Sequence, residues 1–129
     1  MRKAHSKHNE DLCSHLIAQG GFNDWVVTTA FYSALHLTQH QLFPNKYLGT
    51  RCETFSTYYV EIKKTTPSIS KHKAQLDLIF KSLNGGYRYY KFLMTNCQYA
   101  RYNNYQISEN VAIKSKEALD EIKKICNKA

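Results

Sequence analysis

Residues 23–43 read NDWVVTTAFYSALHLTQHQLF, a run without Gly or Pro that carries apolar side chains on nearly every helical face. This pattern is typical of a helix that other helices surround. Asn23 or Asp24 can cap the first turn through a side-chain oxygen, and Pro44 ends the helix because proline cannot donate the next backbone hydrogen bond. We therefore predict a central helix over residues 23–43.

Small and large side chains alternate along this central helix, which suits the core of a helical bundle. Ala30, Ser33 and Ala34 are small enough to let neighbouring helices approach closely. Large buried area is available from Trp25, Phe31, Tyr32, Leu35 and Leu42. We expect the least exposed residues to include Trp25, Phe31, Ala34 and Leu35.

Apolar residues recur at helical spacing in the rest of the chain as well, and the Gly and Pro positions divide it into segments. We predict a first helix over roughly residues 2–18 and, after a loop at 46–50, another over residues 51–64. The next predicted helix is capped by Ser68 or Ser70 and carries Leu76, Ile79, Phe80 and Leu83 on one face. The Tyr-rich residues 87–105 and a last segment from Ser108 onward complete the set. The predicted fold is an all-α bundle of five or six helices without a β-sheet.

The composition indicates one globular domain, residues 1–129. A chain of 129 residues that is 43% apolar is long enough for one core and too apolar for a disordered protein. No apolar run approaches the roughly 18 residues that span a bilayer, and the N-terminal MRKAHSKHNEDL lacks the apolar core of a secretion signal. We expect a cytoplasmic protein without a membrane partner.

Its cysteines form no CxxC pair, and we expect free thiols at Cys13, Cys52, Cys97 and Cys126.

The chain is basic, with 18 Lys and Arg against 10 Asp and Glu and a net charge of +8. Such a charge attracts anions over long range, and nucleic acid is the leading candidate. The alternative is a solvated surface charge that keeps the protein soluble. The Tyr-rich segment 87–105 leaves a similar choice, because an aromatic stripe at helical spacing is more often core than a base-stacking platform. Its basic residues Arg88, Lys91 and Arg101 favour the platform slightly.

The six histidines give two helical spacings that resemble metal sites. His5 and His8 are three residues apart and His15 follows seven later, yet no carboxylate or thiolate lies at a matching step. His36 and His40 have the HExxH spacing, but Leu37 stands where that motif needs its Glu. We therefore predict no metal and no cofactor, and expect His36 and His40 to form hydrogen bonds on the polar edge of their helix.

Three stretches, in order, resemble HEPN domains, small all-α domains of many prokaryotic defence and toxin systems. They are DWVVTTAFYSALHL at 24–37, SKHKAQLDLIF at 70–80 and YYKFLMTNCQYARY at 89–102. The resemblance spans roughly residues 5–125 and implies an up-and-down helical bundle that pairs as a homodimer. Active HEPN ribonucleases carry an Arg followed, after four to six residues, by a His. This pair explains metal-independent cleavage, because the imidazole takes a 2′-hydroxyl proton while the guanidinium holds the phosphate.

In this sequence Arg101 resembles the HEPN arginine, but no His follows it. The resemblance therefore implies a non-catalytic module that binds RNA, a nucleotide or a protein partner, for instance a nucleotidyltransferase-type protein in a toxin-antitoxin pair. The binding residues expected are Arg101, Asn103, Asn104, His72, Lys73 and Tyr102. The alternative is a metal-independent ribonuclease in which His72 replaces the missing His beside Arg101. A purely structural bundle is the third possibility.

Overall fold

The computed structural model describes residues 2–102 and 106–128, which form six helices and one short β-hairpin. In chain order the elements are α1 (Arg2–Gln19), α2 (Asn23–Leu42), β1 (Asn45–Tyr47), β2 (Thr50–Cys52), α3 (Phe55–Thr65), α4 (Lys71–Ser82), α5 (Tyr87–Tyr102) and α6 (Glu109–Lys128). The predicted all-α class and the number of helices are confirmed. We expected no β-strand, and the short hairpin of β1 and β2 shows that this expectation was wrong. Within the described residues, no helix is both long and apolar enough to cross a membrane.

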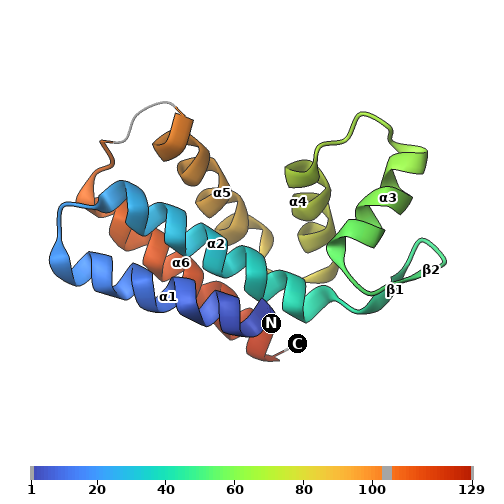
Figure 1. Ribbon diagram of the computed structural model, residues 1–129, viewed down its shortest axis with the longest axis horizontal. Helices are drawn as coiled ribbons and strands as arrows, with labels where there is room; N and C mark the ends of the chain where they lie inside the picture. Colours follow the sequence, from blue (N-terminus) through green and yellow to red (C-terminus); the bar gives the residue numbers. More distant parts are fainter. Residues whose placement is uncertain (1, 103–105, 129) are drawn as a thin grey trace.

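Helix α2 is the central element of the bundle (Figure 1). Helices α1, α5 and α6 pack along it, while α3, α4 and the hairpin form a second group at its C-terminal end. Helices α4 and α5 are antiparallel neighbours, so the start of α4 and the end of α5 lie on the same side of the molecule. The three stretches quoted above, at 24–37, 70–80 and 89–102, thus fall on α2, α4 and α5.

The burial of α2 follows the sequence pattern in its middle and departs from it at its start. Phe31 is 2% exposed and Ala34 is fully buried, as predicted. Trp25, however, is 54% exposed, and Leu35 is only partly buried, so both of these predictions were wrong. Trp25 lies in the first turn of α2 on an exposed face, whereas the next two residues, Val26 and Val27, are buried in the core.

The N-terminal end of α2 differs from the prediction, whereas its C-terminal end agrees with it. The helix begins at Asn23 without a side-chain cap, since the Asn23 Nδ2 atom instead donates to the Ile107 carbonyl at 3.0 Å. Asp24 lies in the first turn, where its charge complements the helix dipole. The C-terminal end agrees with the prediction, because the helix stops at Leu42, just before Phe43 and Pro44.

A hairpin replaces the loop and the first helical turn predicted for residues 46–54. Its strands pair antiparallel, with Lys46 opposite Arg51. The turn residues Leu48 and Gly49 have φ of 52° and 77°, both in the left-handed region that glycine tolerates and leucine rarely adopts. Helix α3 then starts at Phe55 rather than at residue 51.

Helices α4 and α6 both begin with serine caps, and the sequence predicted the one at α4. Of the two candidates before α4, Ser70 is the cap, since its Oγ atom accepts from the Lys73 amide at 3.1 Å. Ser108 accepts from the Val111 amide at 3.2 Å at the start of α6. The side chains that α6 buries are Ala112, Ser115, Ala118, Leu119, Ile122 and Cys126. The cysteines are buried, unpaired thiols, and burial raises the pKa of Cys126 to about 11.

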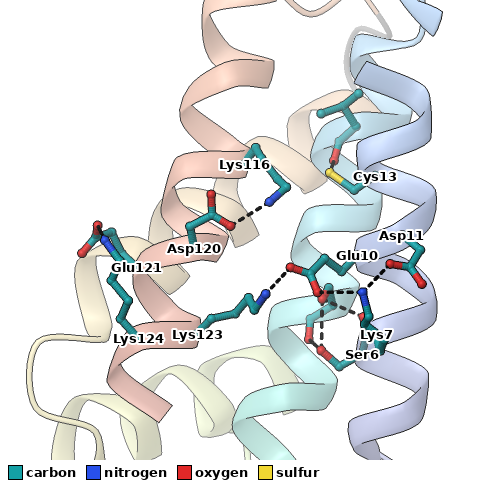
Figure 2. Close-up of polar contacts among 12 residues, drawn as sticks. Ser6, Lys7, Glu10, Asp11, Cys13, Lys116, Asp120, Glu121, Lys123 and Lys124 are labelled. Carbon is teal, nitrogen blue, oxygen red and sulfur yellow. Dashed lines mark hydrogen bonds and ion pairs between the residues drawn. The ribbon is translucent and has the colours of Figure 1, made fainter. Parts of the chain in front are cut away.

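An ion pair links α1 to α6 beside the core (Figure 2). The Lys123 Nζ atom donates to the Glu10 carboxylate, whose side chain is only 12% exposed. The nearest other cation of that carboxylate is the Lys7 ammonium at 4.0 Å. The pair therefore contributes more than a fully solvated ion pair does.

We expect Lys123→Ala to lower the free energy of unfolding by about 1–2 kcal/mol, because the half-buried Glu10 carboxylate loses its main partner. Urea unfolding followed by circular dichroism measures the change. The matched control is Lys124→Ala, since the Lys124–Glu121 pair is well exposed and its loss should cost less than about 0.5 kcal/mol. Equal losses in the two variants would contradict the stabilising role of the Lys123–Glu10 pair.

Candidate functional site

Arg101 lies in the last turn of α5, and a residue of α2 holds its side chain. The Arg101 Nη1 atom donates to the Tyr32 hydroxyl at 2.6 Å, and the guanidinium lies 5.9 Å from the Tyr32 ring and 5.6 Å from the Tyr102 ring. No carboxylate forms an ion pair with Arg101 among the residues that the structure describes. Its charge is therefore positioned by neutral aromatic groups and left without an acidic partner.

His72 lies in the first turn of α4 and faces a cavity between α4 and α5. The cavity has a volume of about 500 Å³, and its lining consists of His72, Thr95, Gln98, Tyr99 and Tyr102. The His72 ring also contacts Phe31 of α2, with 6.2 Å between ring centroids. The same side of α4 thus meets both the core helix and the end of α5.

His72 at the start of α4 and Arg101 at the end of α5 lie on the same side of the molecule, but they do not line one cavity. Among the described residues that line the His72 cavity, Arg101 is not included. The two side chains instead contact successive residues of α2, because His72 lies against Phe31 and Arg101 against Tyr32. An acid–base group and an anion-binding group that act on one phosphate need a shared site. This geometry therefore gives no direct support to the ribonuclease alternative.

The other predicted site residues have different surroundings. Lys73 forms an ion pair with Asp77 at 2.9 Å, which raises the pKa of Lys73, and it lines a separate cavity between α3 and α4. Tyr102 is 75% exposed and faces the His72 cavity. Asn103 and Asn104 lie outside the described residues.

The whole of α5 has an unusual charge pattern. It contains three cations and no acidic residue, and each cation lies close to a tyrosine ring. Arg88 is 4.6 Å from the Tyr89 ring and Lys91 is 5.6 Å from the Tyr87 ring, in addition to the contacts of Arg101. Cations beside aromatic rings, with no acid on the same helix, suit a surface that contacts a polyanion.

Several residues of this site were not singled out in the sequence. Tyr32 holds Arg101 from a position 69 residues away, and the only sequence signal was that a tyrosine in a buried helix needs a partner for its hydroxyl. Thr95, Gln98 and Tyr99 share one face of α5 with the predicted Tyr102, because the four positions are related by three- and four-residue steps. The stripe of Tyr90, Leu93 and Cys97 lies on another face and is buried, as expected for core.

His5 of α1 and His36 of α2 form a cluster with Arg2, separate from the candidate site. His36 is buried and accepts a hydrogen bond from the Arg2 guanidinium, with 2.7 Å between Nη1 and Nδ1. The His5 ring stacks on it at 3.8 Å. Within residues 2–102 and 106–128, no group of three His, Cys, Asp or Glu side chains is placed to hold a metal ion. The hydrogen bond expected for His36 is therefore present, and it is formed at a buried position that Arg2 and His5 cover.

Comparison with known proteins gives no relative for this chain. No family model, no curated protein and no solved structure matches it. The resemblance to HEPN domains therefore stays a prediction, and the geometry of α4 and α5 carries the functional inference.

Proposed function

We propose that the protein binds RNA through the C-terminal end of α5 and does not cleave it. The observation that carries this proposal is the Arg101 guanidinium, which Tyr32 orients while no described carboxylate neutralises it. A planar guanidinium matches phosphate oxygens in geometry and in charge. The net charge of +8 adds long-range attraction to a polyanion.

Several features support binding without turnover. A metal-independent ribonuclease needs a group near neutral pKa that takes the 2′-hydroxyl proton while a cation holds the same phosphate. No His follows Arg101 in the chain, and His72 lines a cavity whose described lining excludes Arg101. Loss of a general base typically lowers the rate about a hundred- to ten-thousandfold. The ribonuclease that uses His72 is accordingly the less favoured function.

We also infer that the protein is a HEPN-like module of a prokaryotic defence or toxin-antitoxin system. The three resembling stretches fall on α2, α4 and α5, respectively, and this order on an all-α fold supports the inference. The homodimer and the nucleotidyltransferase-type partner belong to this proposal and rest on the resemblance alone. A mass measured by light scattering at tens of micromolar tests the homodimer, and a monomeric mass would contradict it.

Replacing Arg101 by Ala should weaken RNA binding about ten- to 150-fold, because one charge-assisted contact contributes about 1.5–3 kcal/mol. The logarithmic slope of affinity against salt concentration should also fall by about one. Fluorescence anisotropy with a labelled RNA at several salt concentrations measures both changes. A free nucleotide added as competitor shows whether the phosphate chemistry alone suffices.

The matched control is Arg51→Ala, because Arg51 lies on the hairpin and pairs with Glu53 at 3.0 Å. It should bind RNA as the wild type does. Unchanged binding by Arg101→Ala together with a lower melting temperature would assign Arg101 a structural role only. The same RNA incubated with the wild type in chelator should stay intact, whereas cleavage that His72→Ala abolishes would establish the ribonuclease instead.

A further inference from the structure

The cavity between α4 and α5 points to the kind of RNA that the protein takes. We propose that it binds single-stranded RNA and accepts one unpaired base between His72 and the tyrosines Tyr99 and Tyr102. This inference rests on the proposed RNA binding and adds the chemical class of the bound segment. Its basis is the composition of the cavity lining and its position beside Arg101.

The size and the lining of the cavity suit a nucleobase. Its volume of about 500 Å³ lies in the range of small-ligand clefts. Tyr99 and Tyr102 are 45% and 75% exposed, and both line the cavity, so their rings are accessible to a ligand there. Bases stack on exposed aromatic side chains with little dependence on sequence. The aromatic content of the lining therefore supplies stacking surface for a base.

The polar side chains of the lining supply hydrogen-bonding groups that no described side chain already pairs with. The Thr95 hydroxyl and the Gln98 amide form no side-chain hydrogen bond with any residue in the described part of the chain. An amide carries both donors and an acceptor, as the Watson–Crick edge of a base does. A duplex hides those edges in its base pairs, whereas unpaired bases present them.

The neighbouring cation connects base and backbone. The Arg101 guanidinium lies 5.6 Å from the Tyr102 ring, so a base beside Tyr102 would bring its own phosphate toward Arg101. Lys91 lies on the α5 face that carries Thr95, one helical turn earlier, and it has no acidic partner among the described residues. The strand would thus follow α5, with its phosphates on the cations and one base in the cavity.

The experiment compares three labelled probes of equal length, namely a single-stranded RNA, its duplex, and an abasic ribose-phosphate strand. The single strand should bind about five- to a hundredfold more tightly than the abasic strand, which is the gain from stacking one base. Tyr99→Ala should remove most of that gain and leave binding of the abasic strand unchanged. Tyr102→Ala should also remove most of the gain, and it should weaken binding of the abasic strand slightly, because the Tyr102 ring lies against the Arg101 guanidinium. Tyr99→Phe and Tyr102→Phe are the matched controls, because they keep the ring and should keep the affinity.

A 2-aminopurine base in the single strand gives a second readout, since stacking on a tyrosine should quench its fluorescence in the wild type and not in the Ala variants. Single-strand binding that depends on Arg101 but is unchanged in both Ala variants would overturn the base site and leave the proposed function standing. Absence of binding to every probe would overturn both. Tighter binding of the duplex than of the single strand would also overturn the inference.

Discussion

Replacing Phe31 by Ala should lower the free energy of unfolding by about 3–5 kcal/mol. The Phe31 side chain is 2% exposed and lies in the middle of α2, so its removal leaves a cavity that the surrounding helices cannot fully close. Its ring contacts Tyr32 at 5.3 Å, Tyr90 at 5.5 Å and His72 at 6.2 Å between centroids. The loss therefore combines buried apolar area with aromatic contacts.

Unfolding in urea, followed by circular dichroism, measures the loss, and Trp25→Ala is the control. Trp25 is on the same helix and is larger, yet it is 54% exposed, so its removal should cost less than about 1.5 kcal/mol. A larger loss from Trp25→Ala than from Phe31→Ala would contradict this expectation. It would indicate that Trp25 is buried in solution, for example by a dimer contact at the first turn of α2. A Phe31→Ala loss below about 1 kcal/mol would contradict its enclosure.

The contrast between Phe31 and Trp25 shows what the sequence of α2 could predict. Apolar residues on all faces correctly indicated a surrounded helix, because this pattern depends only on the period of the helix. The exposure of Trp25 next to the buried Val26 and Val27 depends on which faces of α2 the neighbouring helices cover, which no local pattern encodes. Phe80 of α4 is a similar case, since it was predicted on the apolar face and is 66% exposed, with its ring against Tyr87.

The hairpin escaped prediction for a different physical reason. A two-residue hairpin turn of type I′ needs positive φ at both positions, and Asn-Gly or Asp-Gly is its usual signal. Here Leu48 takes the first of these positions, so the turn lacked that signal. The β-strands are also only three residues each, too short for an alternation of apolar and polar residues to be recognised.

The candidate site was predictable on α5 and α4 only in part. The sequence indicated Arg101, His72 and Tyr102, but it could not show that Lys73 lines the cavity toward α3 or that Tyr32 holds Arg101. These relations depend on how α4 and α5 pack on α2, over separations of up to 69 residues. The local face of α5 with Thr95, Gln98 and Tyr99 was readable from spacing, although the buried stripe beside it gave the stronger signal.

Stability should also depend on acid through His36, which lies away from the candidate site. The imidazole is 8% exposed, and burial is the main reason that its pKa falls from 6.5 to about 4, with the nearby His5 and Arg2 adding to the effect. The unfolded chain keeps an ordinary histidine pKa near 6.5. Between these two values the unfolded state binds more protons than the folded state, so the free energy of unfolding falls as the pH falls from about 6.5 to about 4.

We therefore expect the wild type to lose about 2–3 kcal/mol of stability through His36 alone between pH 7 and pH 4, since each pKa unit corresponds to about 1.4 kcal/mol. His36→Gln removes this titration, so its stability should fall less steeply over the same window, although Gln also gives up the ring contact with His5 and starts from a lower value at pH 7. Urea unfolding at several pH values measures both slopes, and a proton NMR titration of the His36 ring reports its pKa directly. If the stability of the wild type and of His36→Gln fell equally steeply with pH, the His36 imidazole would bind its proton as readily in the folded chain as in the unfolded chain. In that case Arg2 and His5 would have to move away from the charged ring, because the Arg2 guanidinium lies 2.7 Å from its Nδ1 atom and cannot donate to a protonated nitrogen.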